Sequence, residues 1–112
     1  MHILERYNAE LDKLSEQERN LAAQAKERGD EREHSIHLMC ASMLGEMLKV
    51  LGRNHHNRVR PNHIPDIIAH LEREEEQQKK SGDFDSADRT HIKVQTIRQA
   101  LHILERLENE NA

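Results

Sequence analysis

Histidine and carboxylate residues recur at helical spacing in two places, and they are the residues of this chain best suited to metal or proton chemistry. Glu31 is followed three residues later by His34, and Asp88 is followed three residues later by His91. A carboxylate and an imidazole at this spacing share one face of a helix. If both helices turn these faces inward, the four side chains are candidate ligands for a metal ion.

This arrangement resembles the metal site of di-iron carboxylate bundles, in which a Glu from each remaining helix completes the ligand set. Glu18 or Glu75 would supply such a carboxylate. However, His34 falls beside the apolar stripe of its helix, and one of the two pairs has Asp where the pattern has Glu. Charged helices produce such spacings often, so we favour neither a metal site nor a cofactor.

A basic segment at the middle of the chain is the second candidate site. Residues 52–63 contain three arginines and three histidines but no acidic residue, whereas the chain on either side is acidic. Arginine presents a planar fork of donors to phosphate or carboxylate groups. One interpretation is that this hinge binds nucleic acid or a phosphate ligand; the other, which we favour, is that it pairs with the protein's own carboxylates. The candidate binding residues are Arg53, His55, His56, Arg58 and Arg60.

The composition narrows the classes of function. A net charge of −4 with one Tyr and one Phe argues against a general nucleic-acid binder, which uses a basic surface and aromatic rings. The sequence holds no nucleophile elbow, phosphate-binding glycine loop or catalytic triad, so we expect no enzymatic activity. We also expect no membrane segment, no signal peptide and no internal disulfide, since Cys40 is the single cysteine. The expected location is the cytoplasm.

Apolar residues at steps of three and four predict an all-α protein. The helices are expected over residues 2–28, 30–51, 64–81 and 83–108. Gly-Asp pairs at 29–30 and 82–83 each end one helix and cap the next. Short turns force antiparallel neighbours, so the chain is expected to form two antiparallel helical hairpins that pack as a four-helix bundle.

The apolar pattern also predicts which helix faces are buried. Glu18 interrupts the seam of the first helix, and we expect it to be solvated or salt-bridged there, an inward carboxylate that serves a site being the alternative. Residues 72–80 are strong helix formers with nothing to bury, so this stretch is expected to project into solvent or lie on a partner. The face expected to be buried on the last helix consists of Phe84, Ala87, His91, Val94, Ile97, Leu101 and Leu104.

The domain organisation follows from length and repetition. We expect one helical domain over 1–112, made of a first hairpin (1–51), the basic hinge (52–63) and a second hairpin (64–112). A shift of 53 positions aligns the two Gly-Asp turns and several apolar positions, which suggests an internal duplication. Leu, Ile, Val and Phe are only 24 of 112 residues, near the floor of about 20% for folded chains. We therefore expect the protein to self-associate, and to bind a protein partner or its own copy through long helix faces.

Overall fold

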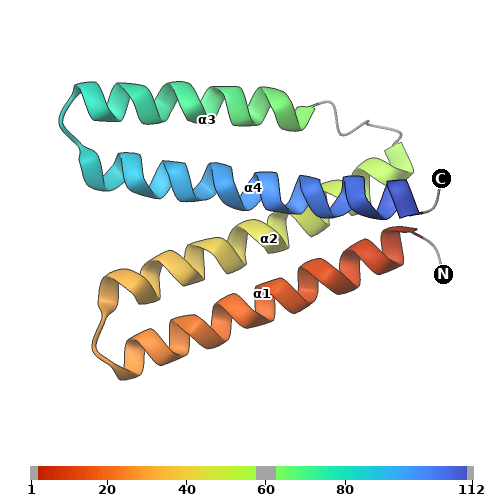
Figure 1. The fold of residues 1–112 in the computed structure, drawn as a ribbon, viewed down its shortest axis with the longest axis horizontal. Coiled ribbons are helices and arrows are strands. Elements are labelled where there is room, and N and C mark those ends of the chain that lie inside the picture. The colour runs from red at the N-terminus through yellow and green to blue at the C-terminus, as the bar shows by residue number, and fades with distance from the viewer. Residues whose placement is uncertain (1–2, 58–62, 111–112) are drawn as a thin grey trace.

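The four predicted helices are present in the computed structural model, which describes the backbone of residues 3–57 and 63–110 and the side chains of residues 5–47 and 65–110. The helices are α1 (Ile3–Glu27), α2 (Glu31–Asn57), α3 (His63–Lys80) and α4 (Phe84–Glu110). Helices α1 and α2 form one antiparallel hairpin, hairpin 1, and α3 and α4 form the other, hairpin 2 (Figure 1). The protein is an all-α four-helix bundle.

The two turns between paired helices are built alike. Gly29 and Gly82 have φ of 76° and 82°, a left-handed conformation that glycine adopts without steric cost. The next residue, Asp30 or Asp83, donates its backbone N–H to a carbonyl five residues back, at 2.9 Å in both turns. Its carboxylate accepts a backbone N–H of the following helix, at 3.1 Å for Asp30 and 3.2 Å for Asp83. Both turns predicted from Gly-Asp are therefore confirmed.

The second helix extends beyond its predicted end at Leu51 and runs to Asn57. Gly52 alone does not stop it, because a helix tolerates an interior glycine at a cost of about 1 kcal/mol. No proline follows before Pro61. The first half of the predicted hinge is thus helical in its backbone, and residues 58–62 lie outside the described part of the chain.

The core lies where α4 packs against hairpin 1. Tyr7 and Leu11 of α1 are fully buried, as is Leu107 of α4. The Tyr7 hydroxyl donates a hydrogen bond of 3.1 Å to the carbonyl oxygen of Ala100, which satisfies a polar group that would be costly to bury alone. The buried cluster consists of Tyr7, Leu11, Leu44, Met47, Ile68, Val94, Ile97, Ala100, Leu104 and Leu107.

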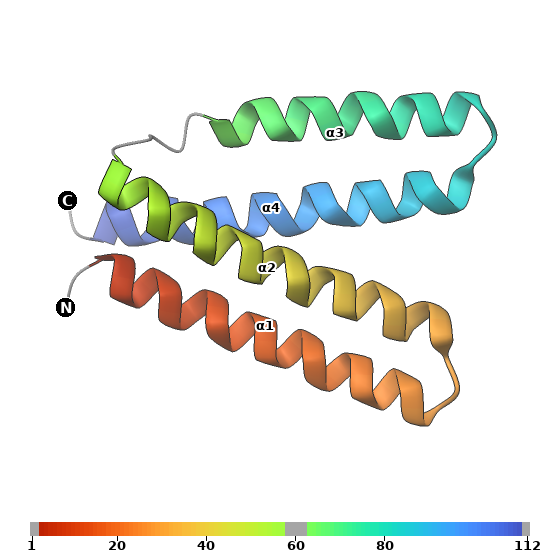
Figure 2. The same ribbon diagram turned by 180° about the vertical axis from the view of Figure 1, so that it is seen from behind.

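Helix α3 is attached at one side only. Among the described residues it packs against α4 and makes no contact with α1 or α2. The two hairpins converge towards the chain termini and spread apart towards their turns (Figure 1, Figure 2). The molecule measures 44 × 34 × 22 Å, with a radius of gyration of 15.4 Å, whereas a compact chain of this length has about 13 Å. The bundle is therefore flat and open.

The last helix differs from expectation at two positions. Phe84 is 66% exposed, and His91 is exposed as well, although both were predicted on the buried face. They lie on the side of α4 that also carries the exposed residues Asp88 and Arg98. In the described part of the chain, no helix is long and apolar enough to cross a membrane.

Candidate functional site

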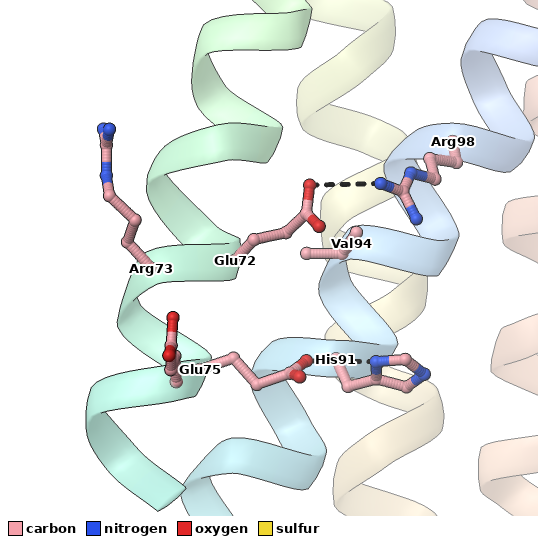
Figure 3. Close-up of a pocket in the computed structure, with 7 residues that line it drawn as sticks. Glu72, Arg73, Glu75, His91, Val94 and Arg98 are labelled. Carbon is pink, nitrogen blue, oxygen red and sulfur yellow. Dashed lines mark hydrogen bonds and ion pairs between the residues drawn. The ribbon is translucent and has the colours of Figure 1, made fainter. Parts of the chain in front are cut away.

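A hollow of about 360 Å³ lies between α3 and α4, on the side where the helices carry charge. Figure 3 shows Glu72 and Glu75 of α3 directed towards Arg98 and His91 of α4, while Arg73 of α3 points away from α4. Ligand sites are commonly of this size but mostly apolar. The lining residues are Glu72, Arg73, Glu75, Glu76, His91, Val94 and Arg98.

Glu75 is the best shielded carboxylate of this hollow, with 15% of its side chain exposed. Lys79 Nζ lies 3.1 Å from its carboxylate, and His91 Nδ1 lies 3.0 Å from Oε1. The hydrogen bond from Lys79, and then the one from His91, holds the pKa of Glu75 below its ordinary value. Glu75 is therefore an ionised anchor for two bases, which makes it a poor general acid.

A second ion pair crosses the same helices one turn away. Arg98 Nη2 donates to Glu72 Oε1 at 3.1 Å (Figure 3). Thr90 adds a hydrogen bond of 2.8 Å to Gln78. Since each of these contacts joins α3 to α4, the stretch 72–80 that was expected to project into solvent or lie on a partner partly lies on its own hairpin. The contacts of Glu72 with Arg98 and of Glu75 with His91 therefore help to hold hairpin 2 together.

The outer side of α3 carries a smaller hollow of about 250 Å³. It is lined by His70, Arg73, Glu74 and Gln77, all of them exposed. The sequence gives no warning of this feature, because it depends on side-chain conformations along a polar helix face.

Three of the four proposed metal ligands take part in contacts with different neighbours. His34 Nδ1 lies 2.8 Å from the backbone oxygen of Ala22, and His91 pairs with Glu75. Asp88 accepts a bond of 3.1 Å from Arg32. Glu31 is exposed at the start of α2. The described residues contain no group of three or more His, Cys, Asp or Glu side chains that could hold a metal ion.

Glu18 forms the salt bridge that its position in the seam suggested. Its carboxylate lies 2.6 Å from Nδ1 of His37, and Nε2 of the same ring lies 3.3 Å from Glu33. The two carboxylates approach opposite nitrogens, so they do not converge on a point where an ion would sit. The contact ties α1 to α2 and is structural in character.

Cys40 is buried, with 7% of its surface exposed, and the Thr96 hydroxyl lies 3.6 Å from its sulfur. Burial raises the pKa of the Cys40 thiol, so the thiolate that would act as a nucleophile is disfavoured. Its burial suits Cys40 to packing between α2 and α4.

The hinge candidates lie outside the described side chains. Arg53, His55 and His56 belong to the helical backbone of α2, and Arg58 and Arg60 fall in the segment that the structure does not describe. Binding of phosphate or nucleic acid by these residues stays a prediction.

The fold and this site together define an all-α bundle with an open, polar helix layer. No family model, no curated protein and no solved structure matches the chain.

Proposed function

We propose that this protein is a small interaction module, of a regulatory or adaptor type, that binds a protein partner or its own copy through exposed helix faces. The observation that carries the proposal is the one-sided attachment of α3, which packs on α4 alone among the described residues. A helix in a closed bundle packs against at least two neighbours. The remaining sides of α3 and the side of α4 next to it are available to a partner.

The surface area supports the same proposal. The chain exposes 7634 Å², whereas a compact monomer of 13.1 kDa exposes about 6,400 Å². A partner in a stable complex covers about 800 Å² on each side. The excess is therefore large enough to accommodate one interface of ordinary size.

Exposed apolar side chains add to this argument. Leu21, Leu38 and Ile67 are 42%, 45% and 44% exposed, and Phe84 is 66% exposed. Single exposed apolar residues are normal on a protein surface. In a chain with so few large apolar residues, their exposure means that the fold does not use its whole capacity for burial.

Hydrogen exchange of the full chain tests the proposal, measured first in dilute buffer and then with added native cell extract or at high protein concentration. We expect α3 to exchange fastest in dilute buffer and to gain protection in at least one of the other conditions. Hairpin 1 serves as the internal reference, because its core amides are already protected. A chain that stays a strict monomer, unfolds in one cooperative step and gains no protection anywhere would contradict the proposal.

A further inference from the structure

A regular stripe of exposed side chains runs along one side of α4. The positions alternate in steps of four and three, which keeps them on one helix face in the manner of a coiled-coil seam. Figure 1 shows no helix crossing in front of α4, whereas in the opposite view of Figure 2 α2 crosses in front of it. The members of this α4 stripe, all exposed, are Phe84, Asp88, His91, Gln95, Arg98 and His102.

If two copies of the α4 stripe lie side by side in opposite directions, each charged residue of one copy faces a residue of opposite charge in the other. The acidic residue lies near one end and the arginine lies near the other, at equal distances from the middle. We propose that a second copy of this chain binds here, with the two α4 helices antiparallel about a two-fold axis near residue 93. This inference rests on the proposed interaction function and names the partner and the surface.

An antiparallel arrangement brings three kinds of pair together, each occurring twice because of the symmetry. Asp88 faces Arg98 of the second copy, and His91 faces Gln95. Phe84 faces His102, so its exposed ring packs on an imidazole. No pair places like charges opposite each other, whereas a parallel arrangement would put Asp88 against Asp88 and Arg98 against Arg98.

The contacts already present within one chain extend this pairing rather than compete with it. Arg32 Nη2 donates to Asp88 at 3.1 Å, and Arg98 donates to Glu72 at 3.1 Å. Across the two-fold axis, the order Arg32, Asp88, Arg98 and Glu72 alternates in sign, with the last two from the second copy. Alternating networks are worth more than isolated surface pairs.

The amount of exposed surface fits a dimer of this kind. The 7634 Å² of exposed area exceeds the expected value for a compact monomer by about 1,200 Å², and a standard interface covers about 800 Å² per chain. Phe84, the most exposed large apolar residue in the described part of the chain, would become covered.

Charge reversal provides the test, with sedimentation equilibrium as the measurement. In Asp88→Arg the new arginine faces Arg98 of the second copy, and in Arg98→Asp the new aspartate faces Asp88. We expect each variant alone to self-associate at least about tenfold more weakly than the wild type. When the two variants are mixed, both layers hold opposite charges again, so the mixture should form a heterodimer. It should associate more tightly than either variant alone but less tightly than the wild type, because the new arginine lies beside Arg32 and the new aspartate beside Glu72 of its own chain.

Two further variants keep the result interpretable. Glu16→Arg makes the same change of charge on the exposed side of α1 and should leave self-association unchanged. Phe84→Ser removes apolar contact without changing charge and should weaken the dimer even if a charge-reversed variant folds poorly. Circular dichroism confirms that each variant retains its helices.

The possible outcomes test three parts of the proposal separately: the α4 stripe as the surface, a second copy as the partner, and interaction as the function. A wild-type protein that is monomeric at every concentration overturns the second copy as partner, while α3 protection in cell extract would still uphold an interaction module. A dimer that is insensitive to Asp88→Arg, Arg98→Asp and Phe84→Ser uses another surface and overturns the α4 stripe. Failure of the mixed variants to associate also counts against the antiparallel pairing.

Discussion

Hairpin 1 and hairpin 2 have the same turn and similar helices, but they are held in place by different interactions. The side of α4 that faces hairpin 1 is packed with apolar residues such as Ile97 and Leu104, around the fully buried Tyr7 and Leu11. Among its described side chains, α3 contributes Ile68 to the buried cluster, with Leu71 partly buried against it. Polar contacts also link α3 to α4. Burial of apolar area stabilises a fold far more than exposed ion pairs do, so stability should be concentrated in hairpin 1 and α4.

Truncation of one buried residue in each region gives the largest contrast. Leu44→Ala should lower the free energy of unfolding by about 3–5 kcal/mol, and Ile68→Ala by about 2 kcal/mol, since Leu44 is 2% exposed and Ile68 is 8% exposed. Urea denaturation followed by circular dichroism measures both values. Hydrogen exchange should show lost protection in every helix for Leu44→Ala but mainly in α3 for Ile68→Ala. Equal losses would mean that hairpin 2 is as well packed as hairpin 1.

The two glycine turns allow a comparison at constant chemistry. Gly29→Ala and Gly82→Ala should each cost about 1–2 kcal/mol, because a Cβ disfavours a left-handed backbone. No atom lies within 4 Å of the added Cβ at either position, so strain in the backbone is the whole effect. We expect the cost at Gly29 to appear in global unfolding and the cost at Gly82 mainly in the exchange of α3.

Gly45→Ala is the matched control, because Gly45 lies inside α2 with open space around it. Alanine there should stabilise the protein by about 0.5–1 kcal/mol. The sign of the change should therefore differ between a helical glycine and the two turn glycines. A stabilising Gly29→Ala would contradict the left-handed turn.

Alkaline titration tests the buried core between hairpin 1 and α4 through Tyr7. Burial raises the pKa of the Tyr7 phenol above its ordinary value of 10.0, so the folded state favours the neutral form. The stability that this contributes is complete below pH 10 and declines as the pH rises above it, because the unfolded chain ionises more readily. Tyr7 is the single tyrosine, so phenolate absorbance should rise together with the loss of helical signal.

Tyr7→Phe should remove this alkaline transition. It should also lower stability near neutral pH by about 1 kcal/mol, since the carbonyl of Ala100 loses its donor. Phenolate formation near pH 10 with the helices intact would show that Tyr7 is accessible to water, and would contradict its burial.

The smallest effect is expected in hairpin 2 at acid pH. Lys79 and His91 lower the pKa of Glu75, so the stability it contributes is present above its ordinary value of 4.5 and is lost as the pH falls below that value. Protection of α3 against exchange should therefore weaken under acid conditions. Glu75→Gln should reduce this dependence on pH, while Glu74→Gln, on the outer side of the same helix, should preserve it.

The helices, both turns and the role of Glu18 could be predicted from sequence because each depends on local spacing or on one capping residue. The end of α2 was predicted too early, since a glycine at position 52 does not by itself show whether the helix stops or continues for another turn. The exposure of Phe84 and His91 was missed for another reason. A three-and-four spacing fits two adjoining stripes of α4, and only the packing of α4 against the other helices decides which of them is buried.

The proposed sites divide in the same way. The Glu31, His34, Asp88 and His91 pattern was visible in the sequence, but whether the pairs meet depends on the crossing of two helices. His34, Asp88 and His91 each contact a different neighbour instead. The polar hollow between α3 and α4 could not be foreseen, because Glu72 and Glu75 acquire partners only through the register of hairpin 2. The charge pattern of the α4 stripe is present in the sequence. It suggests a dimer only once the structure shows that these residues are exposed.

The burial of Cys40 between α2 and α4 has a practical consequence for kinetics. Because the chain has one thiol and the Thr96 hydroxyl lies against it, a thiol-reactive dye should label the sulfur slowly while α2 and α4 stay packed. The rate of labelling would then report how often this contact opens, without any engineered probe.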